Sequence, residues 1–300
     1  MKLSVSVGNN MTTEKWLGGC GISRLDAELL LVYVLRKPRE WVLAYTEYEL
    51  SEKILQQLNS LATEVLQNTP LAYILRYKEF YGRKFVVTPD VLIPRPETEQ
   101  LVELALSLRS SSSFSNWGWR SNPGGDKTNL DRHVANAPRD DTLRVLDIGT
   151  GSGCIGITLK LEHPELDVTL SDISKKALEV AKENSDQLGA DVEIIRSDLI
   201  SDIRSDLYDL TVANLPYVDK TWQISESTKY EPATALFASD GGLELIKKLI
   251  RQAPDHLTTN GHLALEADPR QHREIIKFAT GHGFQHIKTD GFAILFQRNK

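Results

Sequence analysis

The sequence predicts an α/β protein: a doubly wound, mostly parallel sheet with a smaller helical region before it. Three observations support this fold class. After residue 143, short runs rich in Val, Ile and Leu alternate with helical stretches, which is the order that winds a parallel sheet. The first eighty residues show mainly helical periodicity. The chain has 300 residues, enough for two domains of about 150 residues each.

Composition and charge exclude several classes of protein. Hydrophobic residues make up 41% and charged residues 25% of the chain, which is typical of globular proteins and not of collagen-like, disordered or membrane-spanning ones. The net charge of −6 argues against binding that depends on broad neutralisation of phosphates, so no nucleic-acid partner is expected. Cys20 and Cys154 form neither a disulfide framework nor a metal motif. With no signal peptide or membrane span recognised, we expect a cytoplasmic monomer that holds no metal.

The helical region is predicted to cover residues 1–77 as a small bundle. Ser23, with an acid three residues later, has the pattern of a capping box and begins a helix predicted over 23–36. A second helix is predicted over 51–68, because its apolar residues recur at spacings of three and four. One side of each helix therefore faces a neighbour.

A β-hairpin linker is predicted for residues 78–95, where short aromatic and β-branched runs flank Gly82. A helix then begins at Pro96, a residue suited to a first helical turn, and has two acids near the positive end of its dipole. It is predicted to continue to about Leu108.

The main domain is expected over residues 96–300, interrupted by a flexible insertion at 109–141. The insertion is rich in Ser, Gly, Asn and Pro, which bury too little surface to offset the entropy of ordering. The chain should end in an antiparallel strand pair, because the link between its last two strands is too short for a crossover. Strands are predicted at 144–148, 167–171, 192–195, 208–213, 261–266, 286–289 and 292–297, and helices at 154–161, 174–187, 242–256 and 271–280. The sheet is thus seven-stranded and mostly parallel, with an antiparallel last strand.

A glycine-rich turn after the first of these strands is the strongest local signal. Its residues are Gly149, Thr150, Gly151, Ser152 and Gly153. Such a turn at the start of a helix leaves backbone N–H groups open to a ligand. Asp172, at the end of the next strand, is placed to accept the two hydroxyls of a ribose. The sequence therefore predicts a nucleoside site.

Two nucleosides compete for this site. The turn satisfies G-x-G-x-x-G, so an NAD-dependent dehydrogenase is an alternative. An additional glycine, the carboxylate of Asp147 in the preceding strand and the lack of a hydride-transfer acid or base favour S-adenosyl-L-methionine, whose cationic sulfonium gains from a nearby carboxylate. Asp198 and Leu199, after the third strand, are then predicted to lie at the adenine.

A second motif, Asn214-Leu215-Pro216-Tyr217, follows the fourth strand, at the edge where open α/β sheets bind ligands. Methylation of a planar nitrogen requires acceptors that hold its NH₂ group, and we predict the Asn214 side chain and the Leu215 carbonyl for this role. Pro216 would fix that carbonyl, Tyr217 would stack on the flat group, and Asn214 would also border the cofactor. The exocyclic amine of a nucleic-acid adenine or guanine fits the same logic. A scaffold that binds the nucleoside without turnover is a third alternative.

The chain resembles the HemK/PrmC-type peptide chain release factor glutamine N5-methyltransferases over nearly its whole length. The motifs that carry the resemblance are DAELLL at 26–31, PLAYIL at 70–75, EFYGRKF at 79–85, VLIPRPETE at 91–99, LDIGTGSG at 146–153, NLPY at 214–217, YEP at 230–232, ALF at 235–237 and DGGL at 240–243.

The resemblance implies a class I (Rossmann-like) methyltransferase domain behind a helical domain that docks the substrate. It implies methyl transfer from S-adenosyl-L-methionine to the glutamine of a Gly-Gly-Gln loop in release factors, the proteins of translation termination. Residues 149–153 would line the methionine end of the cofactor, 214–217 the substrate amide, and 230–232 would belong to a lid. Leu215 departs from the family motif, which has proline there, and the insertion at 109–141 is longer than the family needs.

Overall fold

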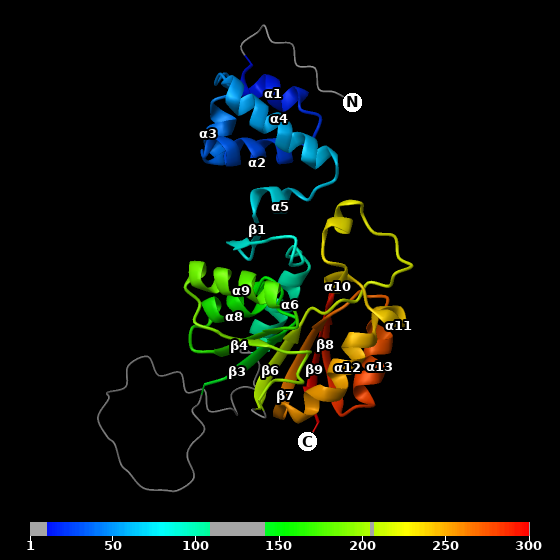
Figure 1. The fold of residues 1–300 in the computed structure, drawn as a ribbon. Helices are drawn as coiled ribbons and strands as arrows, with labels where there is room; N and C mark the ends of the chain where they lie inside the picture. Colours follow the sequence, from blue (N-terminus) through cyan, green and yellow to red (C-terminus); the bar gives the residue numbers. More distant parts are fainter. Residues whose placement is uncertain (1–10, 109–141, 205–206, 300) are drawn as a thin grey trace, which may run out of the picture.

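The computed structural model describes residues 11–108, 142–204 and 207–299 (Figure 1). A group of helices lies at one end and a sheet flanked by helices at the other, with a small hairpin between them. The predicted insertion at 109–141 lies outside the described residues.

The helical part contains both helices predicted from periodicity. The cap of the first is as predicted, because the Ser23 hydroxyl accepts a hydrogen bond from the Asp26 N–H at 3.1 Å. Ser51, where the second helix was predicted to begin, caps that helix in the same way. Three further helices of five to seven residues were not predicted, since such short elements show no period. The helices are α1 Thr13–Gly19, α2 Arg24–Leu35, α3 Arg39–Ala44, α4 Glu52–Leu66 and α5 Leu71–Leu75.

The hairpin joins this part to the sheet. Strands β1 Tyr77–Phe80 and β2 Arg83–Val86 pair antiparallel across the predicted turn. Phe80 and Phe85 are buried in the core beside the main sheet. Helix α6, Thr98–Ser107, begins two residues later than predicted, because the Thr98 N–H donates to the Arg95 carbonyl and first closes a turn.

The main sheet has seven strands in the order β5-β4-β3-β6-β7-β9-β8. Neighbouring strands from β5 to β7 are parallel, while β9 runs antiparallel to both β7 and β8, so the predicted fold class is confirmed. The strands are β3 Arg144–Ile148, β4 Asp167–Asp172, β5 Glu193–Arg196, β6 Tyr208–Ala213, β7 Leu257–Glu266, β8 Phe284–Asp290 and β9 Ala293–Arg298. Strand β7 begins earlier than predicted and pairs with β6 through an irregular register.

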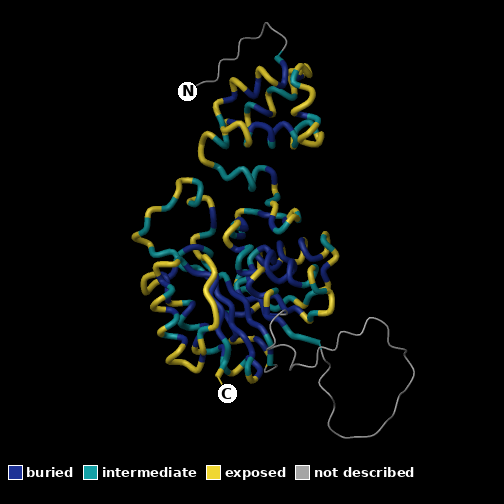
Figure 2. The backbone as a smooth tube through the Cα atoms, turned by 180° about the vertical axis from the view of Figure 1, so that it is seen from behind, coloured by how far each residue is buried: buried dark blue, intermediate teal, exposed yellow. Residues whose placement is uncertain are grey.

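Helices cover both faces of the sheet (Figure 1). Helices α6, α8 and α9 pack on one face, and α12 and α13 on the other, each over its own apolar core. Figure 2 shows the strands buried between these layers. The remaining helices are α8 Cys154–Glu162, α9 Lys175–Leu188, η2 Ser227–Tyr230, α10 Ala233–Leu236, α11 Ser239–Gly242, α12 Glu244–Gln252, η3 Ala253–Asp255 and α13 His272–Thr280.

One predicted helix, over 242–256, is divided in the structure. Gly242 has a φ of +84°, so α12 begins only at Glu244, and a proline in η3 ends α12 at Gln252. Among the described residues, no helix has both the length and the apolar content needed to cross a membrane.

The strand order reverses between β3 and β6, since β4 lies on one side of β3 and β6 on the other. Ligands of open α/β sheets bind at the carboxyl ends of the strands at such a point. The glycine turn follows β3 and the Asn214 motif follows β6, so both predicted motifs lie at this edge.

Candidate active site

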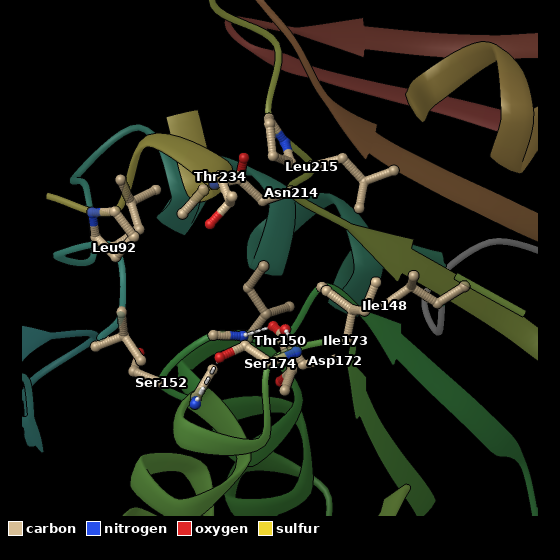
Figure 3. Close-up of a pocket in the computed structure, with 18 of the residues that line it drawn as sticks. Leu92, Ile148, Thr150, Ser152, Asp172, Ile173, Ser174, Asn214, Leu215 and Thr234 are labelled. Carbon is tan, nitrogen blue, oxygen red and sulfur yellow. Dashed lines mark hydrogen bonds between the residues drawn. The ribbon is translucent and has the colours of Figure 1, made fainter. Parts of the chain in front are cut away.

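A cavity of about 540 Å³ opens at the carboxyl ends of β3, β4 and β6 (Figure 3). Most of the predicted site residues line it. They are Gly149, Thr150, Gly151, Ser152, Asp172, Asp198, Leu199, Asn214, Leu215 and Pro216. Two others do not: Gly153 lies behind the turn as the N-cap of α8, and Tyr217 lines a second, smaller cavity.

Asp172 and the glycine turn hold each other in place. The Gly151 N–H donates to Asp172 Oδ2 at 3.0 Å, and the Ser174 N–H donates to Oδ1 at 2.8 Å. Burial raises the pKa of Asp172, while these backbone donors act in the opposite direction. Each carboxylate oxygen keeps a lone pair for a further donor such as a ribose hydroxyl.

Gly149 brings the turn against the second motif. Its φ is +68°, and a Cβ there would lie 2.9 Å from Cδ2 of Leu215, so a side chain at residue 149 would require the Leu215 side chain to shift. Leu215 itself is buried in the core between the sheet and α12. Leu215, which stands where the family motif has proline, thus fills apolar space with its side chain while its backbone stays at the cavity.

Asp147 does not have the place that the sequence argument gave it. It is fully buried, is not among the cavity-lining residues, and accepts hydrogen bonds from Thr150 Oγ1 at 2.6 Å and the Gly156 N–H at 2.9 Å. Burial raises its pKa to about 6. The Asp147 carboxylate, which was expected to attract the sulfonium, therefore does not face the cavity and instead holds the glycine turn from the interior of the protein.

Asp198 lies at the outer part of the cavity. Its carboxylate accepts a hydrogen bond from Lys248 Nζ at 2.7 Å, and about half of its side chain is exposed. A ligand's amino group would have to share this carboxylate with Lys248. The contact with adenine stays a prediction.

The second cavity, of about 210 Å³, adjoins the first at the Asn214 motif. Asn214, Leu215 and Pro216 border both cavities. Leu92, Arg95 and Ala235 border both as well. Two molecules bound in the two cavities would therefore meet along this shared boundary, as a group donor and its acceptor must.

Two buried residues at this junction were not predicted as site residues. Asn214 Nδ2 donates to Thr98 Oγ1 at 3.1 Å, and Tyr217 Oη donates to Glu266 Oε1 at 3.2 Å. Thr98 is 2% and Glu266 1% exposed. The sequence carried a signal for each: Thr98 lies within the VLIPRPETE motif, and Glu266 is an acid that ends an apolar strand.

The segment after β6 is tied to the loop before α6. Glu231 is buried and accepts from Arg95 Nη2 at 2.5 Å and from the Ile93 N–H at 3.0 Å. The Tyr230 hydroxyl donates to the Gln67 carbonyl of the helical part at 2.7 Å. In Figure 1 this segment, between β6 and α10, rises from the sheet towards α5. Two motifs distant in the sequence thus form one wall beside the cavities.

A metal centre has no support in the described residues, where no three His, Cys, Asp or Glu side chains gather to hold an ion. Cys154 is a buried free thiol whose pKa burial raises to about 12, so it is not a nucleophile near neutral pH.

The sheet order, the glycine turn at its switch point and the two cavities that meet at an Asn-x-Pro-Tyr turn define a class I methyltransferase. The chain matches the model of the family described as "Methyltransferase small domain" over residues 130–295 and that described as "PrmC N-terminal domain" over residues 16–75. A release factor glutamine methyltransferase from Koribacter versatilis is 37% identical over 255 residues, which cover 82% of this chain and 81% of that protein. The chain belongs to the PrmC family of release factor glutamine methyltransferases.

Another relative is longer than this chain. A bifunctional methyltransferase from Rickettsia bellii is 36% identical over 271 residues, which are 89% of this chain but 48% of that protein. The chain thus spans about half the length of the bifunctional relatives that it matches. Among solved structures, the hMettl16 catalytic domain in complex with MAT2A 3'UTR hairpin 6 aligns with a TM-score of 0.50 and 15% identity over 81% of each chain, which supports the fold alone.

Proposed function

We propose that the chain transfers a methyl group from S-adenosyl-L-methionine to the side-chain amide nitrogen, N5, of the Gly-Gly-Gln glutamine in peptide chain release factors. The observation that carries the proposal is the junction of the two cavities at Asn214, Leu215 and Pro216. The relatives that this chain covers over most of their length are release factor glutamine methyltransferases, which supports the same substrate.

The larger cavity suits the cofactor. Its volume of about 540 Å³ lies within the range of cofactor sites, and the glycine turn leaves room that a Cβ would fill. We assign residues 149–152 to the methionine end, Asp172 to the ribose hydroxyls, and Asp198 with Leu199 to the adenine. When bound there, the cofactor supplies an electrophilic methyl group on a sulfonium.

The smaller cavity suits the amide. A carboxamide nitrogen shares its lone pair with its carbonyl, so it attacks only if it is held close to the methyl group and in line with it. Asn214 Oδ1 and the Leu215 carbonyl are the acceptors that we assign to its two N–H groups. As the C–N bond forms, the methyl–sulfur bond would break and S-adenosylhomocysteine would leave. The N–H groups become more acidic and their hydrogen bonds strengthen, so the acceptors stabilise the transition state more than the bound substrate. One of these protons is then lost to solvent, which leaves a neutral N-methyl amide.

Single-turnover methylation of a release factor tests the proposal. Asn214→Ala should lower the rate by about 100-fold to 1,000-fold, as for the loss of a comparable polar group, while affinity for S-adenosylhomocysteine changes much less. A release factor whose Gly-Gly-Gln glutamine is replaced should accept no methyl group. Methylation of that protein at the normal rate, transfer to an oligonucleotide instead, or tight NAD binding would overturn the proposal.

The proposal includes a monomer that acts in the cytoplasm, without nucleic acid as a partner. Cys20 and Cys154 are both buried and unpaired, which suits a reducing compartment.

A further inference from the structure

The proposed role of Asn214 requires one orientation of its side-chain amide. Oxygen and nitrogen occupy nearly equivalent positions in this group, but only the oxygen accepts hydrogen bonds. If the amide turned over, its NH₂ group would face the N–H groups of the substrate, donor against donor. A neighbouring group must therefore hold the nitrogen end away from the substrate.

Thr98 is that neighbour. Its Oγ1 accepts a hydrogen bond from Asn214 Nδ2 at 3.1 Å. It is the first residue of α6 and is 2% exposed, so water does not compete for the hydroxyl. A hydroxyl can also donate a hydrogen bond, however. If the Thr98 hydroxyl donated to Asn214 Oδ1, it would stabilise the opposite orientation of the amide, in which the NH₂ group faces the substrate.

Glu266 is the neighbouring acceptor that can set the direction of this hydroxyl. It ends strand β7, is 1% exposed and lines the smaller cavity. Its Oε1 accepts from the Tyr217 hydroxyl at 3.2 Å, and the neighbouring Thr98 hydroxyl also favours its charged form. Its Oε2 is buried without a hydrogen-bond partner among the described residues, so the carboxylate keeps acceptor capacity. An ionised carboxylate accepts only, so both hydroxyls must donate to it.

We infer that Thr98 and Glu266 are positioning residues, which through a hydrogen-bond chain from Asn214 to Thr98 to Glu266 keep Asn214 Oδ1 facing the substrate amide. The inference rests on the proposed function and adds two residues to its machinery. With Glu266 ionised, Thr98 donates to the carboxylate and accepts from Asn214. With Glu266 protonated, the acid can donate to Thr98, whose hydrogen is then free to turn towards Asn214.

The protonation of Glu266 changes near neutral pH. Burial raises its pKa to about 7, and the charge of Glu97 adds to this, while Thr98, Tyr217 and Asn214 act in the opposite direction. The ionisable groups that face this region are Glu97, Arg95, Tyr217, Cys154 and Asp268. The pKa values of the Tyr217 hydroxyl and the Cys154 thiol are raised, so neither titrates near pH 7.

A matched pair of variants at Thr98 tests the chain. Thr98→Val keeps the shape of the side chain and removes the hydroxyl, whereas Thr98→Ser keeps the hydroxyl. Thr98→Val should lower kcat by about tenfold, the effect of one hydrogen bond that fixes an orientation, and Thr98→Ser should stay near the wild-type rate. Thr98 also lines the larger cavity, but Val keeps its branched shape and Ser keeps its hydroxyl, so the KM for the release factor and the affinity for S-adenosylhomocysteine should change less than kcat in both variants.

The pH profile tests Glu266 with the folded wild-type protein and does not depend on the Thr98 variants. Since the ionised form is the active one, kcat should rise with pH through about 7, and Glu266→Gln should give a low kcat without this rise. Equal kcat for Thr98→Val and Thr98→Ser, or a wild-type profile that Glu266→Gln reproduces, would overturn the inference and leave the proposed function standing. A wild-type protein that methylates no release factor at pH 8 would overturn both.

Discussion

Replacement of Gly242 by alanine should damage the fold next to the substrate cavity. Gly242 is the last residue of α11 and has a φ of +84°. A Cβ at this position would overlap the carbonyl oxygen of Tyr217 and lie 2.7 Å from its carbonyl carbon and 2.6 Å from Gln271 Nε2. The same Nε2 donates to the Tyr217 carbonyl at 2.8 Å and to the Gly241 carbonyl at 2.7 Å. The DGGL motif therefore supports the backbone of Tyr217.

Two costs contribute to the expected loss of stability. A left-handed backbone conformation costs an L-residue about 1–2 kcal/mol, and a disrupted hydrogen bond to the Tyr217 carbonyl adds about 0.5–1.5 kcal/mol. Gly242→Ala should thus lower the free energy of unfolding by roughly 2–3 kcal/mol, with any shift of the Tyr217 backbone in addition. The rate of methyl transfer should fall as well, because Tyr217 lines the smaller cavity.

Gly189→Ala is the matched control. Gly189 has a φ of +71°, but a Cβ there would meet no atom within 4 Å, so only the first cost applies. Urea unfolding of both variants, followed by single-turnover methylation, separates the clash from the backbone cost. If both variants lose the same stability and both methylate like the wild type, the close approach of Gly242 to the Tyr217 carbonyl affects neither stability nor activity, and the reasoning is wrong.

Three further predictions concern the cofactor site and the wall beside it. Asp172→Ala should weaken S-adenosylhomocysteine binding by about 1.5–3 kcal/mol in calorimetry, because charge-assisted hydrogen bonds to the ribose are lost; unchanged affinity would remove Asp172 from the site. Burial raises the pKa of Asp147 from 3.8 to about 6. The contribution of its protonated form to stability is therefore present below pH 3.8 and is lost as pH rises to 6, by roughly 3 kcal/mol. Asp147→Asn should flatten this part of the stability profile in urea titrations at several pH values, and an unchanged profile would contradict the raised pKa of Asp147. Arg95→Met should speed proteolysis of the segment after β6, because it leaves the buried Glu231 without its cation. The control Lys229→Met breaks an exposed ion pair and should not change the rate of cleavage. Equal cleavage of the two variants would show that the Arg95–Glu231 pair does not hold the segment.

Features that depend on neighbours in the chain were predicted well. The cap at Ser23 and the helix start at Ser51 follow from side chains that reach only three residues ahead. The glycine turn after β3 and the antiparallel pairing of β8 with β9 follow from local backbone geometry and a short link. Because few residues decide each of these features, the sequence shows them directly.

Features that depend on contacts between distant segments were missed or misplaced. Asp147 carries the same carboxylate whether it faces a ligand or the interior, and only the packing of α8 over β3 places it behind the turn. The three short helices of the helical part depend on tertiary packing, because isolated helices of that length are unstable.

By itself, the sequence determined the α/β class, the order of the strands along the chain and the two motifs at the ends of β3 and β6. Only the tertiary structure decided that Thr98, 116 residues before Asn214, accepts a hydrogen bond from the Asn214 amide, and that Glu266, 49 residues after Tyr217, accepts one from the Tyr217 hydroxyl and lines the smaller cavity. The physical reason is that a hydrogen bond requires two groups about 3 Å apart, and such proximity arises from the packing of α6 and β7 around β6, not from spacing along the chain.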